Sequence, residues 1–298
     1  MKKILITGAD GFIGGYLLEL LDKLENIDYK CICIAENNKV KQENQIIANI
    51  LDAELVHKIV SEYQPDVILH MAAIANVVVD DLHKLYEINV IGTENILRAA
   101  SSISSKKIRF IMMSSAGVYG NQEPMYYNEN LPYNPANHYS YTKMIDEFLC
   151  KQYENQIEII RVRPFTVIGK NQTQGFFVAK LVDAYKKKLN KIEVGNIDSI
   201  RDYVDVKYCA SVLKELIMRD NIPFSVINIC GGRTITGKEV ISTLNNLTGH
   251  YPEIVINDKF VRKNEVWHLV GDPTRVHEFM RETEQQRSFE EMIKEMLY

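Results

Sequence analysis

The chain has 298 residues, of which 46% are hydrophobic and 25% are charged, and its formal net charge is −4. These values describe an ordinary globular protein that is long enough for one large domain with a smaller lobe, or for two domains. The negative charge excludes a generally basic surface for nucleic acid, and the absence of an apolar stretch near the roughly 20 residues that span a bilayer excludes a membrane helix.

The first two-thirds of the chain alternates β-branched runs with longer amphipathic stretches. The runs predict strands at residues 3–7, 30–35, 45–49, 67–70, 108–113 and 158–162, and the stretches predict helices at 12–24, 53–63, 82–101 and 138–153. Such alternation predicts parallel β-α-β units in a doubly wound α/β sheet with helices on both faces.

The first apolar run ends at Gly8 and no cleavage site follows it, so we expect no signal peptide and a cytoplasmic protein.

Three glycines follow the first predicted strand, and the last of them lies inside the first predicted helix. Gly8, Gly11 and Gly14 have the spacing GxxGxxG. Glycines at such a turn permit a tight bend, close approach of the backbone to a pyrophosphate, and close packing of helix on strand. The helix N-terminus adds free amides and the positive end of a dipole. This segment therefore predicts a dinucleotide coenzyme.

The end of the second predicted strand bears on which coenzyme is used. Glu36 lies just past that strand, 22 residues after Gly14. A carboxylate there accepts hydrogen bonds from the adenosine ribose and repels a 2′-phosphate, which favours NAD(H). Lys39 and Lys41 are close enough in sequence to reach a phosphate, so NADP(H) stays open as the alternative.

The cysteines are an odd set without metal-ligand spacing, and they comprise Cys31, Cys33, Cys150, Cys209 and Cys230. Cys31 and Cys33 alternate within a strand-like run and should point to the same face. Buried, reduced thiols are predicted, with neither a disulfide nor a metal site.

Two segments carry the residue types of a proton-transfer site. Ser114 and Ser115 follow the fifth predicted strand, at the end where open parallel sheets bind ligands. Tyr139 precedes Lys143 by four residues, which places both on one face of the predicted helix. A neighbouring ammonium favours the ionised form of a phenol and suits a tyrosine to general acid–base work.

The glycine triplet, the Ser-Ser-x-x-Val-Tyr-Gly segment at 114–120 and the Tyr-x-x-x-Lys pair together resemble the extended short-chain dehydrogenases and reductases, the NAD-dependent epimerase/dehydratase family, over nearly the full length. The resemblance implies a Rossmann-type sheet and a substrate that is a nucleotide-diphosphate sugar. It implies Ser115 as the substrate-orienting hydroxyl, Tyr139 as acid and base, and Lys143 as the residue that binds the nicotinamide ribose. Asn89 matches the family's NxxGT motif, and Asn49 replaces the usual aspartate beside adenine. The implied coenzyme-binding residues are Gly8, Gly11, Phe12, Ile13, Gly14, Glu36, Asn49, Ile50, Met71, Ala72, Ala73, Asn89, Tyr139 and Lys143.

The C-terminal third predicts a smaller lobe interleaved with the first domain. Helices are predicted at 176–189, 207–219 and 237–247, and residues 226–230 are expected to return to the main sheet. We therefore expect a dinucleotide-binding Rossmann domain at 1–165, joined by about 200–230, and a substrate-binding lobe mainly at 166–298.

Four residues of this lobe are implied as substrate ligands by the same resemblance. Arg201 and Arg262 would hold the diphosphate, Glu265 would bind the ribose, and Thr166 stands where the family usually has asparagine. A guanidinium suits a diphosphate because its fork donates several charge-assisted hydrogen bonds. Without the resemblance, Arg201 reads as a surface arginine paired with Asp202 or Asp205.

The region 175–206 is most similar to the family's reductases of GDP-4-keto-6-deoxymannose. The family's 4,6-dehydratases carry an acid–base pair directly after the serine or threonine, where this chain has Ala116 and Gly117. We therefore expect an NAD(P)H-dependent reductase of a GDP- or dTDP-linked 4-keto-6-deoxy sugar. A C4 epimerase or sugar-nucleotide dehydrogenase is the alternative, and a non-catalytic dinucleotide sensor is a third reading. The helices at 82–101 and 138–153 resemble those that pair family subunits, which implies a homodimer.

Overall fold

The computed structural model describes residues 1–75, 80–103, 105–261, 264–281 and 285–298. They form two compact units, each assembled from three segments of the chain. Unit 1 comprises Met1–Val118, Asn137–Arg163 and Ala210–Ile227, and unit 2 comprises Tyr119–Ala136, Pro164–Cys209 and Asn228–Tyr298. Among the described helices, none is both long and apolar enough to cross a membrane.

A seven-stranded parallel sheet organises unit 1, with the strand order β11-β6-β5-β4-β1-β2-β3. Its strands are β1 (Lys2–Thr7), β2 (Ile27–Cys33), β3 (Gln45–Ile47), β4 (Val67–His70), β5 (Arg109–Met113), β6 (Glu158–Pro164) and β11 (Val226–Ile229). The order reverses direction between β1 and β4, and β1 pairs in parallel with both β4 and β2. This is the predicted doubly wound sheet, including the return of residues near 226 to its edge.

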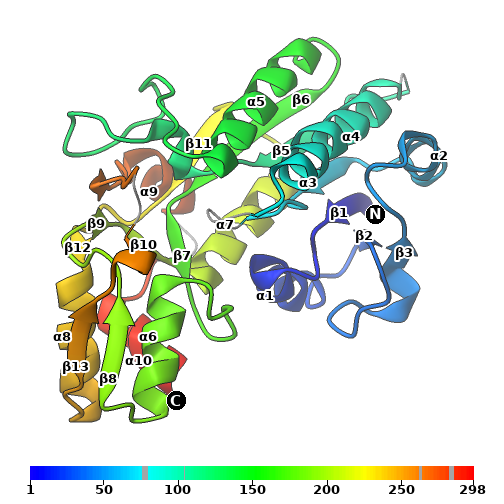
Figure 1. The fold of residues 1–298 in the computed structure, drawn as a ribbon. Coiled ribbons are helices and arrows are strands. Elements are labelled where there is room, and N and C mark those ends of the chain that lie inside the picture. Colours follow the sequence, from blue (N-terminus) through cyan, green and yellow to red (C-terminus); the bar gives the residue numbers. More distant parts are fainter. Residues whose placement is uncertain (76–79, 104, 262–263, 282–284) are drawn as a thin grey trace. The chain divides into compact units, whose positions relative to one another are not determined.

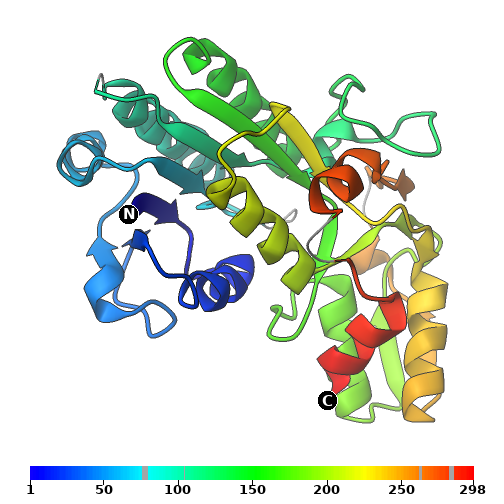
Figure 2. The same ribbon diagram turned by 180° about the vertical axis from the view of Figure 1, so that it is seen from behind.

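Helices cover both faces of this sheet (Figures 1 and 2). On one face, α2 (Ala53–Tyr63), α4 (Gly92–Ser101) and α5 (His138–Tyr153) bury an apolar cluster against the strands, with Val60, Leu97 and Phe110 among its members. On the other face lies α7 (Val206–Met218), whose last carbonyls accept hydrogen bonds from Lys2 and Arg109. The remaining unit 1 helices are α1 (Phe12–Leu21), α3 (Leu82–Tyr86) and the 3-10 turn η1 (Gln42–Asn44).

Several predicted elements have other ends than those observed, as with α1, which ends at Leu21 instead of residue 24. Two further differences have a visible structural cause. The predicted helix at 82–101 is broken by a π turn, η2 (Glu87–Ile91), between α3 and α4. The second strand runs from Ile27 to Cys33 instead of over 30–35, because its last partner is Ile47 of β3, and Ile34 and Ala35 beyond it are exposed. The helix predicted at 138–153 has those bounds as α5, where the Asn137 side chain caps the N-terminus by accepting from the Ser140 amide.

Unit 2 is built on three helices, α6 (Phe177–Lys186), α8 (Gly237–Thr248) and α10 (Phe289–Leu297), which share one apolar core. Both α8 and α10 begin with complete capping boxes, at Thr236 with Glu239 and at Ser288 with Glu291. Small sheets pair β7 (Thr166–Ile168) with β10 (Tyr203–Asp205), β8 (Lys191–Val194) with β13 (Glu253–Ile256), and β9 (Ile200–Arg201) with β12 (Ile235–Thr236) and β14 (His268–Leu269). Further elements of unit 2 are α9 (Thr274–Met280) and η4 (Asp258–Phe260), and η3 (Ala116–Tyr119) lies almost entirely in unit 1.

Candidate active site

The glycine turn lies between β1 and α1 and is shaped for close backbone contact. Gly8 has φ +71°, and a Cβ there would lie 2.6 Å from the amide nitrogen of Ala72. A Cβ on Gly14 would lie 2.3 Å from the carbonyl oxygen of Ala9. Gly11 caps α1 without a side-chain hydrogen bond, so the first amides of the helix remain available. The donors and the room fit the pyrophosphate of a dinucleotide. Phe12 and Ile13, implied as coenzyme ligands, are the first two residues of α1.

The side chains implied to face the adenosine are exposed near the ends of β2 and β3. Glu36 is exposed, and Lys39 donates through Nζ to the carbonyl oxygen of Asp10 in the glycine turn at 2.9 Å. Lys41 instead pairs with Asp22 at 2.9 Å. Lys39 is therefore the cation of the two that lies at the glycine turn.

Asn49 and Ile50 follow β3. The Asn49 side chain accepts a hydrogen bond from the Leu51 amide at 3.0 Å and is exposed. Ile50 is buried, and its carbonyl oxygen accepts from the Asn95 side chain at 3.0 Å. Ile50 is thus fixed by α4, while the Asn49 amide group faces solvent.

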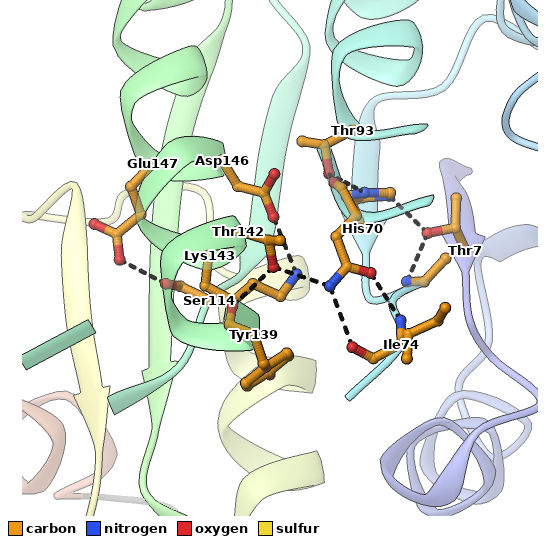
Figure 3. Close-up of polar contacts among 12 residues, drawn as sticks. Thr7, His70, Ile74, Thr93, Ser114, Tyr139, Thr142, Lys143, Asp146 and Glu147 are labelled. Atoms are coloured by element: carbon orange, nitrogen blue, oxygen red, sulfur yellow. Dashed lines mark hydrogen bonds and ion pairs between the residues drawn. The ribbon is translucent and has the colours of Figure 1, made fainter. Parts of the chain in front are cut away.

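A buried chain of hydrogen bonds joins β1, β4 and α4 (Figure 3). His70 lies between Thr7, 2.8 Å from its Nδ1, and Thr93, 2.9 Å from its Nε2. The Ala72 amide donates to the Thr7 hydroxyl, and the Thr93 hydroxyl donates to the carbonyl oxygen of Asn89. Each hydroxyl has one hydrogen, so all of these bonds form only if Thr7 donates to Nδ1 and the proton of His70 is on Nε2. Burial and, secondarily, the charge of Lys143 lower the pKa of His70 to about 3, so the ring is neutral.

Asn89 connects this region to α5. Its side chain accepts from the Ile74 amide at 2.8 Å and donates to the Ile74 carbonyl oxygen at 3.1 Å. It also donates to the Thr142 hydroxyl at 3.0 Å. Asn89 thus holds the segment after β4, which contains Met71, Ala72 and Ala73, to α5. It lies in the π turn, a distortion that often marks functional positions.

Tyr139 and Lys143 lie in successive turns of α5, in the first half of the helix (Figure 3). Tyr139 is half-buried, and Lys143 is buried with its Nζ 3.2 Å from Oδ2 of Asp146. In Figure 3 the Tyr139 ring extends away from Asp146 while the Lys143 chain reaches toward it. The spacing predicted from the sequence therefore places the phenol and the ammonium on one side of α5.

The two serines after β5 have different surroundings. Ser114 is buried and donates to Glu147 at 2.6 Å, and Glu147 forms a buried ion pair with Arg163 at 2.6 Å. Ser115 is half-buried and accepts from the Gly117 amide at 3.0 Å. Ser114 is therefore part of the packing between β5 and α5, and Ser115 is the serine whose side chain is partly accessible.

In unit 2, the residues implied to bind substrate are partly engaged with each other. Arg201 on β9 donates to Glu265 at 2.6 Å, and both side chains are mostly buried. The pairings with Asp202 or Asp205 considered for Arg201 are wrong. Asp202 accepts from the amides of Gly231, Gly232 and Gly271, and Asp205 pairs with Arg287. Thr166 begins β7, and Arg262 lies outside the described residues.

Several residues of unit 1 were missed by reading the sequence. Thr7, His70 and Thr93 come from three elements, and no local pattern unites them. Asp146 had a signal, because it follows Lys143 by three residues and therefore shares its helix face. All five cysteines are buried, as predicted.

Comparisons with known proteins agree with this architecture. Residues 5–296 match the family described as GDP-mannose 4,6 dehydratase. The chain is 34% identical over 274 residues to GDP-6-deoxy-D-talose 4-dehydrogenase of Aggregatibacter actinomycetemcomitans. The aligned region covers 92% of this chain and 90% of that protein. It is 26% identical to GDP-6-deoxy-D-mannose reductase of Pseudomonas aeruginosa, over 93% of this chain and 90% of that protein.

Solved structures share the fold over almost the whole chain. The Thermus thermophilus UDP-glucose 4-epimerase in complex with NAD has a TM-score of 0.83 at 23% identity, covering 99% of this chain and 97% of its own. RMD from Pseudomonas aeruginosa complexed with NADPH has a TM-score of 0.82 at 24% identity, covering 100% and 98%. The fold therefore accommodates either nicotinamide coenzyme in these structures.

Proposed function

Because the chain belongs to the extended short-chain dehydrogenases of the NAD-dependent epimerase/dehydratase family, we propose that it is a reductase of a nucleotide-linked 4-keto-6-deoxy sugar. The sugar would be GDP- or dTDP-linked. A relative that acts as a GDP-6-deoxy-D-talose 4-dehydrogenase supports the GDP-linked form, since reduction of a C4 ketone is the reverse of oxidation of a C4 alcohol. The observation that carries the proposal is the absence of an acid–base pair directly after Ser115.

Ala116 and Gly117 occupy the two positions in question. Ala116 is buried, and a Cβ on Gly117 would lie 2.4 Å from Oγ of Ser140 and 3.2 Å from Oγ of Ser115. A side chain at position 117 would therefore first meet the hydroxyl groups of Ser140 and Ser115. Dehydration needs a base for the C5 proton and an acid for the departing C6 hydroxyl, and neither a methyl group nor a hydrogen serves.

The proposed chemistry uses three side chains of unit 1. A bound nicotinamide coenzyme supplies the hydride that reaches C4. Ser115 donates a hydrogen bond to the C4 carbonyl oxygen, and Tyr139 donates the proton that this oxygen gains. The ammonium of Lys143 binds the nicotinamide ribose and favours the phenolate that remains on Tyr139. Met71, Ala72 and Ala73 continue from β4 beside the glycine turn and would contact the coenzyme backbone.

Substrate binding is assigned to unit 2. Arg201 would hold the diphosphate. Glu265, whose carboxylate lies 2.6 Å from the Arg201 guanidinium, would bind the ribose hydroxyls and keep the guanidinium oriented. Thr166 would meet the sugar. Arg262 is the second proposed diphosphate ligand. Unit 1 would then be the coenzyme-binding part of the chain.

An epimerase or a dehydrogenase using the same residues is the second candidate, and the fold shared with a UDP-glucose 4-epimerase supports it. An epimerase returns its hydride to the sugar, so it retains NAD and turns over without added coenzyme. A reductase consumes NADH in proportion to product. The intact set of Ser115, Tyr139 and Lys143 favours either enzyme over a dinucleotide sensor, which needs no proton relay.

NMR of two reactions tests the proposal. NADH with a GDP- or dTDP-linked 4-keto-6-deoxyhexose should give the 6-deoxyhexose with stoichiometric NADH oxidation. The parent GDP- or dTDP-hexose with NAD should give no 4-keto-6-deoxy product. A new C6 methyl signal from the parent hexose would contradict the reductase assignment. Turnover without coenzyme consumption would instead support the epimerase.

A homodimer is proposed through α5. Tyr141 and Phe148 are 43% and 47% exposed and lie seven residues apart on one helix face. Ile91, at the end of the π turn before α4, is 51% exposed. Pairing of this face with a second copy would remove these apolar side chains from water.

A further inference from the structure

The ammonium of Lys143 pairs with a carboxylate to which the proposed mechanism gives no role. Asp146 lies one turn further along α5, and its Oδ2 is 3.2 Å from Nζ of Lys143 (Figure 3). The Asp146 side chain is fully buried, and that of Lys143 is 3% exposed. Two opposite charges this close and this dry interact far more strongly than a surface pair.

Burial of the Asp146 carboxylate at this position carries a free-energy cost. Among the described residues its second oxygen, Oδ1, has no hydrogen-bond partner, although it is buried. Burial raises the pKa of Asp146 to about 6, against the opposing effect of Lys143. The carboxyl group is therefore ionised above about pH 6 and neutral below it. A charge buried with one unsatisfied oxygen contributes little to stability, so its presence beside Lys143 calls for a functional explanation.

The other groups that face Asp146 leave Lys143 as its main electrostatic partner. On α5, Glu147 is compensated by Arg163, and burial keeps the thiol of Cys150 protonated by raising its pKa. From α4, the neighbouring Thr93 side chain is uncharged, and its hydroxyl donates to the Asn89 carbonyl oxygen. From β4, His70 is neutral because burial lowers its pKa to about 3.

We propose that Asp146 is a positioning residue for Lys143. The negative charge of Asp146 tempers the effect of the Lys143 ammonium on Tyr139 and keeps the phenol protonated for proton donation. The inference rests on the proposed roles of Tyr139 and Lys143. An unopposed ammonium near a phenol favours the phenolate, which cannot donate a proton to a ketone. With Asp146 ionised, its negative charge opposes the positive charge of the Lys143 ammonium.

Replacing Asp146 by Asn keeps the shape and removes the charge, so the full charge of Lys143 acts on Tyr139. The phenolate then forms at lower pH, and the alkaline limb of the reduction rate should move down by about 1 pH unit, the size expected for loss of one nearby charge. Below about pH 6 the wild-type carboxyl group is already neutral, so the two proteins should converge there.

A spectroscopic titration tests this without any sugar substrate. The absorbance of Tyr139 phenolate is obtained as the difference between each protein and the same protein carrying Tyr139→Phe. Asp146→Asn, and Asp146→Ser as a second charge-removing variant, should shift this titration to lower pH by about 1 unit. Glu94→Gln is the matched control. Glu94 lies on α4, contacts Tyr153 instead of Lys143, and also has a buried oxygen without a hydrogen-bond partner among the described residues.

A shift in both Asp146 variants and not in the control supports the proposal, whichever sugar the enzyme takes. An unchanged Tyr139 titration in a folded Asp146 variant overturns it. Failure of both variants to fold, judged by circular dichroism, also overturns it, because Asp146 would then be a structural residue. If the reductase assay fails while the Asp146 variants still show the expected shift of the Tyr139 titration, only the proposed function is contradicted.

Discussion

At the scale of single residues, Tyr139 is the group on which turnover should depend most. It is half-buried at the start of α5, one turn before Lys143. Tyr139→Phe keeps the ring and removes the proton donor, so turnover should fall by roughly a hundredfold or more. Coenzyme affinity should barely change, because the glycine turn and Lys143 are untouched. Steady-state rates and a coenzyme titration measure the two quantities, and comparable turnover in both proteins would remove Tyr139 from the mechanism.

Glu36 should decide the choice of coenzyme. Its carboxylate is exposed past the end of β2, while Lys39 contacts the glycine turn. We expect wild type to bind NADH more tightly than NADPH, and Glu36→Ala to narrow the difference, because the 2′-phosphate is then no longer repelled.

Fluorescence titration with both coenzymes measures the preference. Lys41→Ala is the control, since Lys41 is engaged with Asp22 and should not affect the ratio. Tighter binding of NADPH by wild type would instead make Lys39 the deciding residue.

Residues that act through local spacing could be predicted, and residues that act through tertiary contacts could not. Tyr139 and Lys143 are four apart on one helix, so the sequence alone placed them together. His70 bonds Thr7, which is 63 residues away, and Thr93, which is 23 residues away. The Arg201 pairing failed for the same reason, because Glu265 is 64 residues distant while Asp202 is adjacent.

At the scale of elements, the packing of α1 on β1 should depend on Gly14 and not on the adjacent Gly15. A Cβ on Gly14 would lie 2.3 Å from the Ala9 carbonyl oxygen, whereas one on Gly15 would meet nothing within 4 Å. Gly14→Ala should therefore lower the free energy of unfolding by about 2 kcal/mol and weaken coenzyme binding, since the turn must shift.

Gly15→Ala is the matched control and should raise the free energy of unfolding by about 0.5–1 kcal/mol, because alanine restricts the unfolded chain and favours helix. Urea denaturation of both variants measures this. Equal effects of the two substitutions would contradict the assigned packing.

The predicted helix at 82–101 shows where element prediction ends. Its apolar periodicity is that of one continuous helix, yet η2 interrupts it at Glu87–Ile91. Within this turn, Asn89 bonds the Ile74 backbone and Thr142, which are tertiary contacts that no local pattern predicts. By contrast, α2 and α5 have the predicted bounds, since Asp52 and Asn137 cap them from the adjacent sequence position.

At the scale of the whole molecule, dimer formation through α5 should be sensitive to charge on its exposed apolar face. Phe148→Glu should convert the proposed dimer to a monomer at micromolar concentration, because a buried unpaired carboxylate opposes association. Phe176→Glu is the matched control, since Phe176 is 41% exposed but belongs to unit 2. Sedimentation velocity distinguishes the species. A wild-type protein that sediments as a monomer would contradict the dimer proposal.

The path of the chain through the sheet also has a consequence for biosynthesis. β11 covers the edge of β6 but begins only at Val226, whereas the other six strands are complete by Pro164. A ribosome adding about 5–20 residues per second therefore leaves β6 as a bare edge for several seconds, with Ile159, Ile160 and Val162 beside unpaired backbone groups. Such an edge can pair with another nascent chain. Slow translation between residues 164 and 226 should thus lower the yield of native protein, whereas slow translation after residue 229 should not.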